Sequence, residues 1–248
     1  MFSLFGSSKK TTPDLSFLVA DMHSHLLPGL DDGLQEIEQT IAFMQELREI
    51  GYKKLICTPH ILSDVYPNSP ETILPKLELV RSALNENNVD IQVEAAAEYM
   101  VDIEFEDYVN AGKPLLTFGK NLILIEMSYA AVSNNIENVI FNLRMKGLQP
   151  VLAHPERYNY YFGDLEKFQR FIDLGCYLQI NILSLLGYYG DAAKNTAQNL
   201  LKKNMVTLVG TDMHHENHLN GLIALASKKS FYKLFENVQI RNKELLLQ

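Results

Sequence analysis

A short apolar run, a polar loop and an amphipathic segment ending on Gly or Asn follow one another about seven times along this chain. This order is typical of the βα unit. The apolar runs are nearly continuous and do not alternate, as expected for parallel strands covered on both faces. The predicted strands are residues 17–20, 54–57, 91–97, 122–125, 150–153, 177–182 and 206–210.

Helices are predicted between these strands. Apolar residues spaced by three and four from Leu34 to Leu47 share one face of a helix that ends at Gly51. A second helix begins at Ser69, which can cap its free amides, with Pro70 in the first turn. Further helices are predicted over residues 135–146, 164–174 and 192–203, and they end at Gly147, Gly175 and Asn204.

Repeated βα units with right-handed crossovers favour a closed or nearly closed α/β barrel. A doubly wound open sheet of seven strands is the alternative that this pattern leaves open. No Pro-, Gly- or Ser-rich linker divides the chain, so we predict an N-terminal arm over residues 1–16 and a single domain over residues 17–248.

Composition excludes several other classes of protein. The 248 residues carry a formal net charge of −8, which disfavours a nucleic-acid partner. The two cysteines, Cys57 and Cys176, are too few for a disulfide framework and indicate a reducing compartment. No apolar run approaches the roughly 18 residues that span a bilayer, and no signal peptide is predicted. We therefore expect a cytoplasmic protein without membrane insertion.

Six of the seven predicted strands lead into a His or a carboxylate, and the sixth strand ends at Asn181. In a βα barrel the carboxyl ends of the strands form one rim, where active sites lie. Counted from the first strand to the last, with Asp32 in the first loop, the candidates are His23, His25, Asp32, His60, Glu98, Glu126, His154, Asp212 and His214.

Several unpaired carboxylates at one end of a barrel would each cost several kcal/mol, so they require a compensating positive charge. Arg157 is the one basic residue inside these motifs, and metal cations are a sufficient source of the remaining charge. His23 and His25 are two residues apart, so both imidazoles can reach one metal. Nine candidate ligands suit two or three divalent ions, and a set without thiolates favours manganese, iron or zinc. His215 and His218 are assigned to the surroundings of the site.

The motifs, in chain order, are His23-Ser24-His25, Asp31-Asp32-Gly33, Thr58-Pro59-His60, Ile125-Glu126, residues 153–158 (Ala-His-Pro-Glu-Arg-Tyr) and Thr211-Asp212-Met213-His214. In this combination they resemble the polymerase and histidinol phosphatase (PHP) superfamily. Within it they are most similar to the CpsB-type tyrosine-protein phosphatases of bacterial capsular and exopolysaccharide gene clusters.

The resemblance implies a distorted seven-stranded (β/α)7 TIM-like barrel, a trinuclear site usually associated with manganese, and dephosphorylation of a tyrosine autokinase. It assigns His23, His25, Glu98 and Asp212 to the first metal. Glu98, Glu126 and His154 would hold the second, and Asp32, His60 and His214 the third. The catalytic residues are expected to be Arg157, His60 and Asp212, with Arg157 gripping the phosphate. No second Arg lies near the last motif.

Other functions stay open at this point. They include a histidinol-phosphate phosphatase of the same superfamily and a metal-binding regulatory domain without turnover, whereas the acidic net charge disfavours a nuclease of that superfamily. A thiol-based tyrosine phosphatase is excluded, because Ser63 and Ile182 occupy the positions six residues after the two cysteines, where Arg would be needed. A phosphotyrosine ring could stack on Tyr129, Tyr158, Tyr160, Tyr161 or Phe162.

Overall fold

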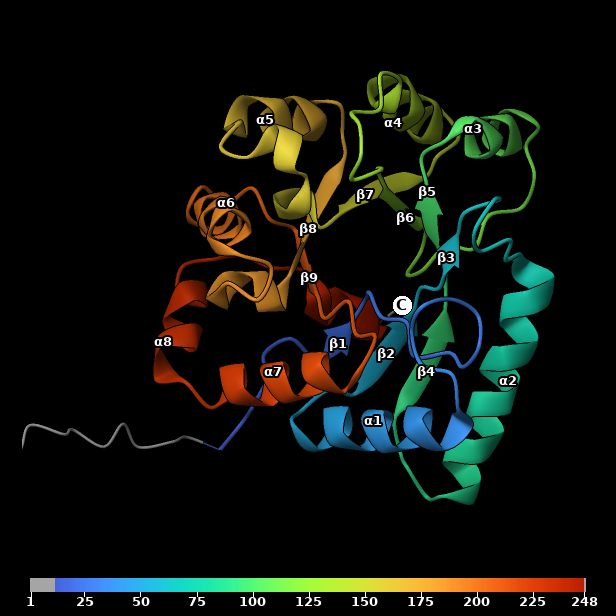
Figure 1. The fold of residues 1–248 in the computed structure, drawn as a ribbon, viewed down its shortest axis with the longest axis vertical. Coiled ribbons are helices and arrows are strands. Elements are labelled where there is room, and N and C mark those ends of the chain that lie inside the picture. The colour runs from blue at the N-terminus through green and yellow to red at the C-terminus, as the bar shows by residue number, and fades with distance from the viewer. Residues whose placement is uncertain (1–11, 248) are drawn as a thin grey trace, which may run out of the picture.

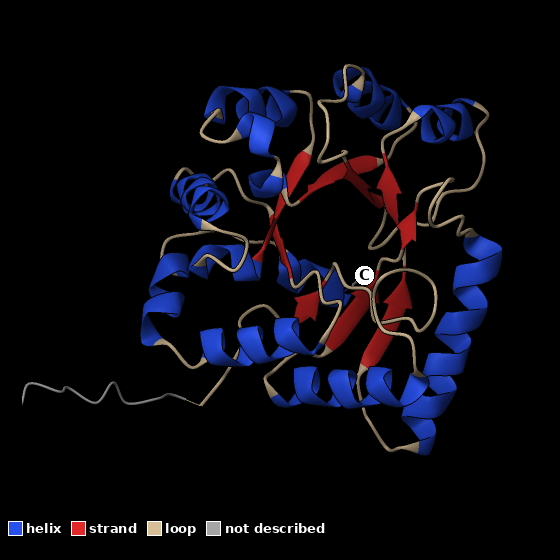
Figure 2. Ribbon diagram, in the orientation of Figure 1, coloured by secondary structure: helices blue, strands red, loops and turns tan. Residues whose placement is uncertain are grey.

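Parallel strands form a ring with helices around its outside in the computed structural model of this protein, which describes residues 12–247 (Figure 1, Figure 2). One sheet has the order β1-β2-β4 and the other the order β3-β5-β6-β7-β8-β9, and every named pair is parallel. The strands are β1 (Ala20–Asp21), β2 (Lys54–Cys57), β3 (His60–Ile61), β4 (Gln92–Ala95), β5 (Glu98–Met100), β6 (Leu122–Glu126), β7 (Gln149–Ala153), β8 (Tyr177–Asn181) and β9 (Leu208–Gly210).

The short strands combine into the seven predicted positions. β2 and β3 are two parts of one strand interrupted at residues 58–59, and β4 and β5 are two parts of another interrupted at residues 96–97. The Ala96 N–H donates to the Cys57 carbonyl (2.8 Å) and the Glu98 N–H donates to the Pro59 carbonyl (3.1 Å), so the pairing continues across both interruptions. His60 and Glu98 therefore belong to strands and not to the loops that follow them.

The first and last strands are joined by backbone hydrogen bonds. The Asp212 N–H donates to the His23 carbonyl (2.8 Å), the His25 N–H donates to the Met213 carbonyl (2.9 Å), and Ser24 forms a parallel bridge with Met213. The strand order follows the chain around the ring without the reversal that defines a doubly wound sheet. The predicted α/β barrel is confirmed, and the open-sheet alternative is wrong.

The helices lie outside the ring and cover its outer face (Figure 1). Ser69 and Thr72 form a capping box at the start of α2, with Pro70 in its first turn as predicted. The three helices missing from the prediction are α3, which Asp102 caps by accepting the Phe105 N–H, α7 and the four-residue α8. The helices of the described residues are α1 (Ile37–Glu49), α2 (Pro70–Glu86), α3 (Ile103–Asn110), α4 (Ile136–Met145), α5 (Leu165–Asp173), α6 (Asp191–Lys202), α7 (Glu216–Ala226) and α8 (Lys229–Tyr232). Within residues 12–247 no helix combines the length and the apolarity that crossing a bilayer requires.

The first strand was predicted too early in the chain. Residues 17–20 were expected to be extended, but the strand covers only Ala20–Asp21, because Val19 has a φ of 68° and the chain before it forms a turn. Leu15 is fully buried in the core, two residues before the predicted start of the domain, and its N–H donates to the Ile50 carbonyl. Residues 1–11 of the predicted arm lie outside the described residues.

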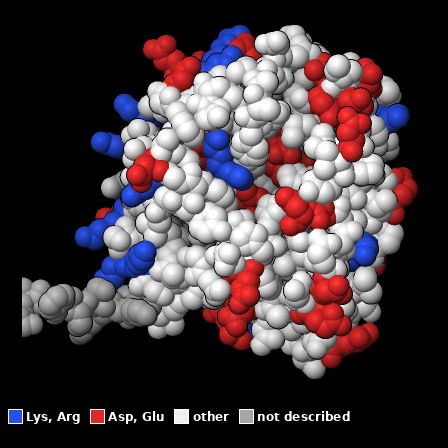
Figure 3. All heavy atoms as spheres, viewed as in Figure 1, with Lys and Arg blue, Asp and Glu red and all other residues white. Residues whose placement is uncertain are grey.

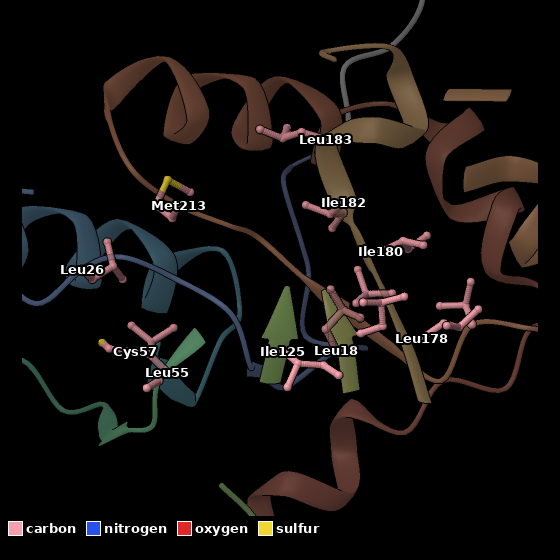
Figure 4. Packing of buried hydrophobic residues seen from close by; sticks show 14 of the residues in the cluster. Leu18, Leu26, Leu55, Cys57, Ile125, Leu178, Ile180, Ile182, Leu183 and Met213 are labelled. Carbon is pink, nitrogen blue, oxygen red and sulfur yellow. The ribbon is translucent and has the colours of Figure 1, made fainter. Parts of the chain in front are cut away.

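Apolar side chains of the strands alternate between the interior of the ring and the layer beneath the helices. Ile56 belongs to a small cluster with Met22 and Leu124, whereas the neighbouring Leu55 and Cys57 belong to the large cluster (Figure 4). Both faces of each strand are therefore buried, which explains the continuous apolarity of the sequence.

The 3₁₀ segment Asn242–Leu247 contacts the strands near their N-terminal ends. Leu245 joins the small interior cluster, and its carbonyl accepts a hydrogen bond from the buried Lys54 ammonium (2.8 Å). This segment closes the end of the ring that lies opposite the rim of the candidate ligands.

Candidate metal centre

The structure brings all nine predicted ligands together at the carboxyl ends of the strands. They fall into four overlapping groups, and within each group the ligand atoms lie within 4.8 Å of one another. The groups are His25 with Asp32, His60 and His214; His23 with His154 and Asp212; His23 with His25 and Glu98; and His60 with Glu98 and Glu126. Glu98, at the start of β5, has 0% exposure and lies at the centre of the cluster.

The two Glu98 oxygens contact imidazoles from three different strands. Oε1 lies 2.9 Å from His154 Nε2, and Oε2 lies 3.1 Å from His23 Nε2 and 3.2 Å from His60 Nδ1. Glu126 Oε1 approaches the same His60 nitrogen at 2.8 Å. Oxygen and imidazole donors at these separations, in a largely buried cluster without thiolates whose member Asp32 is exposed, are a donor set that fits divalent metal ions.

The four groups divide the ligands differently from the assignment that the resemblance implies. His154 groups with His23 and Asp212 and also contacts Glu98, whereas the resemblance places it with Glu98 and Glu126. His60 lies in two groups, one of them with Glu126. The set of nine residues is the same in both descriptions, and only the grouping within it differs.

The carboxylates and imidazoles of the cluster shift each other's titration. Burial alone would lower the pKa of His23, but the charges of Glu98 and Asp212 outweigh it and raise that pKa to about 9. Burial would raise the pKa of Glu98, but the charges of His23 and His60 hold it well below its usual value. Burial raises the pKa of Glu126, and the neighbouring Glu98 charge raises it further. Opposite charges within the cluster, such as those of His23 and Glu98, thus stabilise each other.

Asp31 orients the His25 ring by contacting its Nδ1 atom. Its Oδ2 lies 2.7 Å from His25 Nδ1 and accepts the His60 N–H (3.0 Å), while Oδ1 accepts the Gly33 N–H (3.0 Å). A carboxylate on Nδ1 leaves Nε2 of the same ring available as a ligand atom. Asp31 belongs to the quoted Asp-Asp-Gly motif, but no role was predicted for it.

Strand β8 contributes no candidate ligand and supports two of them. Gln179 Oε1 lies 2.9 Å from His23 Nδ1, and its Nε2 donates to Asn181 Oδ1 (2.9 Å). Asn181 Nδ2 donates to Asp212 Oδ2 (2.6 Å). The two side chains are two residues apart on one strand, so they point to the same face, and this spacing was the sequence signal for their shared role.

Glu156 fixes the loop that carries Arg157. Its Oε1 accepts hydrogen bonds from the Asn181 N–H (2.8 Å) and the Ser184 hydroxyl (2.6 Å), and the side chain is fully buried. Burial raises the pKa of this carboxyl to about 7. Arg157 follows in the same 3₁₀ turn, Pro155–Arg157, and its Nη1 donates to Asp212 Oδ2 (2.8 Å).

A cavity of about 280 Å³ opens above the cluster. Figure 3 shows acidic side chains at the bottom of a hollow in the middle of this face, beside a basic side chain. Arg157, Tyr129 and Tyr189 line the cavity together with ligands of the cluster, as do His215 and His218. Nothing in the sequence singled out Tyr189, which lies eight residues after the end of β8.

The other aromatic candidates have different surroundings. Tyr158 is fully buried, and its hydroxyl donates to the Ala153 carbonyl and accepts the Met127 N–H. Tyr161 packs edge-on against Phe168 and Phe171. Tyr160 and Phe162 do not line the cavity, so Tyr129 is the one predicted aromatic residue that does.

A βα barrel with a His and carboxylate cluster at its rim defines the class of metal-dependent barrel hydrolases. The chain belongs to the capsular polysaccharide synthesis family CpsB/CapC, which matches residues 19–248. This membership confirms the resemblance stated from the motifs.

Several relatives and solved structures are similar over most of the chain. Tyrosine-protein phosphatase YwqE of Bacillus subtilis is 27% identical over 233 residues, which are 92% of this chain and 91% of that protein. Tyrosine-protein phosphatase CpsB of Streptococcus agalactiae is 26% identical over 200 residues, 79% of this chain and 82% of that protein.

Among solved structures, one from a study of YwqE and Streptococcus pneumoniae CpsB, described as metal-dependent tyrosine phosphatases, matches with a TM-score of 0.77. It is 26% identical and covers 92% of this chain and 94% of that one. The phosphotriesterase homology protein of Escherichia coli shares the fold, with a TM-score of 0.52 at 15% identity over 90% of this chain and 96% of that one.

Proposed function

We propose that this chain is a metal-dependent protein-tyrosine phosphatase. The observation that carries the proposal is the cluster of nine His and carboxylate ligands at the bottom of a cavity that Arg157 also lines. The relatives named as tyrosine-protein phosphatases support the same activity.

The cluster is proposed to hold two or three divalent ions, with manganese as the expected metal and iron or zinc as alternatives. His23, His25, Asp32, His60, Glu98, Glu126, His154, Asp212 and His214 would be the ligands. When bound, such ions supply Lewis acidity and positive charge to a phosphoryl group. Glu98 belongs to two of the four groups, so it is the carboxylate best placed to be shared.

Arg157 would bind the substrate phosphate. Its guanidinium has five N–H donors in a planar fork, and the one hydrogen bond found for it among the described residues uses a single donor, toward Asp212. The remaining donors can engage two phosphate oxygens together, which an ammonium group could not do in the same way. His60 and Asp212 are proposed to be catalytic residues as well as metal ligands. His60 lies beside Glu126, and Asp212 lies beside the Arg157 guanidinium.

The proposed substrate is a phosphotyrosine-containing protein, in particular a bacterial tyrosine autokinase that controls capsular or exopolysaccharide synthesis. A phenolate leaving group has a parent pKa of about 10, so its departure depends less on a general acid than that of an alkyl alcohol. The cytoplasmic location is part of this proposal, since it is where a kinase domain and its phosphatase would meet.

The test combines metal analysis with an assay. The purified protein is assayed on a phosphotyrosyl peptide as isolated, after chelation, and after re-addition of Mn²⁺, and its metal content is measured in parallel. We expect at least two metal ions per chain, loss of activity on chelation and recovery with Mn²⁺. Fewer than two ions, or activity that chelation leaves unchanged, would refute the proposal.

Two further measurements separate the alternatives. Faster hydrolysis of histidinol phosphate than of the phosphotyrosyl peptide would assign the chain to the other phosphatase activity of the superfamily. A folded His23→Ala variant with the wild-type rate would favour a metal-binding domain without catalytic use of the cluster.

A further inference from the structure

Arg157 lies between two tyrosine rings supplied by the neighbouring strands. Its guanidinium carbon is 4.9 Å from the ring centre of Tyr129 and 4.2 Å from that of Tyr189. Arg157 follows β7, Tyr129 follows β6 and Tyr189 follows β8, and these three strands are adjacent in the sheet. The two rings therefore approach the guanidinium from the loops on either side of its own.

The guanidinium has little else to hold it. Among the residues that the structure describes, the hydrogen bond from Nη1 to Asp212 Oδ2 is the one found for this side chain, which is 24% exposed. One hydrogen bond fixes one nitrogen and leaves the planar group free to turn about it. Contacts of the cation with two ring faces restrict this rotation, because the attraction depends on the position of the cation over each ring.

The two tyrosines are held differently. The Tyr129 hydroxyl lies 3.2 Å from His154 Nδ1, so this residue also contacts a candidate ligand. The Tyr189 hydroxyl is buried and has no hydrogen-bond partner within residues 12–247. Its ring packs edge-on against Tyr188, with 5.0 Å between the ring centres. What Tyr189 offers to the site is therefore the face of its ring.

We propose that Tyr189 is a positioning residue for phosphate binding, which acts by holding the Arg157 guanidinium with its free N–H groups directed toward the cavity. The proposal rests on the proposed phosphatase function. It also accounts for a site with a single arginine, since a guanidinium fixed in advance loses less conformational freedom when it binds the phosphate.

The experiment compares Tyr189→Leu, which removes the ring, with Tyr189→Phe, which keeps it. We expect Tyr189→Leu to lower kcat/KM for a phosphotyrosyl peptide about 3- to 30-fold, the range that corresponds to a partly desolvated cation–π contact. Binding of inorganic phosphate to the metal-loaded protein, measured by calorimetry, should weaken by a similar factor while the metal content stays unchanged. Tyr189→Phe should remain within about 2-fold of the wild type in both measurements, because the hydroxyl has no hydrogen-bond partner among residues 12–247.

A double-mutant cycle shows whether Tyr189 acts through Arg157. In an Arg157→Lys background, Tyr189→Leu should add less than about 2-fold, since the planar group that the ring holds is already gone. Tyr108→Leu is the matched control: Tyr108 in α3 also has a cation over its ring, Lys113 at 5.0 Å, and it does not line the cavity. That variant should bind phosphate like the wild type.

Three outcomes would overturn the inference. Wild-type phosphate affinity and kcat/KM in Tyr189→Leu would show that the ring has no role, and an equal loss in Tyr189→Phe would assign the effect to the hydroxyl. Full additivity with Arg157→Lys would mean that Tyr189 acts independently of the arginine. If circular dichroism shows that Tyr189→Leu does not fold, Tyr189→Met takes its place. A wild-type protein that binds phosphate but fails to hydrolyse the peptide would refute the phosphatase proposal, and the phosphate titrations would still test Tyr189.

Discussion

Asp31 contacts candidate metal ligands without being one of the nine, so replacing it tests how much the surroundings of the ligands contribute to metal binding. It accepts three hydrogen bonds, from His25 Nδ1 (2.7 Å), the His60 N–H (3.0 Å) and the Gly33 N–H (3.0 Å), and it is 8% exposed. Two of these donors belong to candidate metal ligands. The perturbation we consider is Asp31→Asn, which keeps the shape of the side chain and removes its charge.

The magnitude follows from the geometry of an amide. An Asn oxygen in the place of Oδ2 could still accept from His25 and His60, but the NH₂ group would then face the Gly33 N–H, donor against donor. One buried donor left without an acceptor costs about 1–3 kcal/mol of unfolding free energy. That loss corresponds to roughly 2–12 °C in Tm for a domain of this size. The missing charge weakens the hold on His25, and loss of such a supporting carboxylate typically reduces metal affinity about 10- to 100-fold.

The assay has two parts. Thermal unfolding in the presence of a chelator measures the change in stability without bound metal, and titration with buffered Mn²⁺ measures the metal affinity. Asp164→Asn is the matched control, because Asp164 also accepts a backbone N–H, that of Lys167 at 3.0 Å, and contacts none of the nine ligands. An Asp31→Asn protein that is folded and binds Mn²⁺ within about 2-fold of the wild type would refute the role assigned to this carboxylate.

Three further predictions concern the fold. Asn242 is fully buried and forms hydrogen bonds with both backbone groups of Val209 and with the Ala20 carbonyl, so Asn242→Ala should lower the unfolding free energy in urea by about 2–5 kcal/mol. Asn237 is exposed, and Asn237→Ala should change this free energy by less than about 0.5 kcal/mol. A loss below about 1 kcal/mol for Asn242→Ala would contradict the role of Asn242. Burial raises the pKa of the Cys176 thiol to about 12, so iodoacetamide should label this cysteine at pH 8 only in denaturant. Burial of the neutral thiol contributes fully to the unfolding free energy below about pH 8.5, and this contribution is lost as the pH rises toward 12. Fast iodoacetamide labelling of the native protein at pH 8 would contradict the prediction. Finally, His154 has a φ of 34°, so the His154→Gly variant should be at least as stable to urea as the His154→Ala variant. In ordinary strand positions Gly instead costs about 0.5–1 kcal/mol relative to Ala. A His154→Gly variant less stable than His154→Ala would contradict strain at this residue.

The barrel could be predicted because its strands are buried on both faces and its helices carry clear end signals. Pro70 and Gly51 mark helix ends in the sequence and in the structure, and a Cβ at Gly51 would meet the Ser16 nitrogen at 2.6 Å. The exact start of β1 could not be predicted. Val19 adopts a left-handed conformation, which depends on packing and which a β-branched residue rarely adopts, so the sequence gives no sign of it. The interruption at residues 96–97, between β4 and β5, could not be predicted either, because two alanines continue the apolar run without a change in composition.

The candidate ligands could be located because one rule, that parallel strands end at one rim, acts on all of them together. Their supporting residues depend on distances across the barrel. Gln179 and Asn181 reach His23 and Asp212 only because β8 lies beside β9 and the ring closes between β9 and the first strand. A sequence shows which residues share a strand face, but not which residue of another strand lies opposite them.

Backbone strain gives independent support to the site. Of the five non-glycine residues with positive φ among those described, Asn88 and Asn204 lie at helix ends, where Asn tolerates this conformation, and Val19 precedes β1. The other two are His154 (φ 34°) and Asp212 (φ 51°), and both are candidate ligands. Such conformations cost about 1–3 kcal/mol each for most residues with a side chain, and less for Asp, which like Asn tolerates them.

The same two strained residues connect the metal cluster to the arginine. The Arg157 N–H donates to the His154 carbonyl (2.9 Å), and its Nη1 donates to Asp212 Oδ2 (2.8 Å). A relaxed extended conformation at His154 would continue β7 in a straight line and carry the following 3₁₀ turn away from the cluster. The left-handed residue after β7 instead turns the chain at once, so that the candidate ligand His154 and the Arg157 guanidinium, the proposed phosphate-binding group, both line the cavity. The strained residues His154 and Asp212 are therefore the ones that position Arg157 relative to the candidate ligands, and with it the phosphate that Arg157 is proposed to bind.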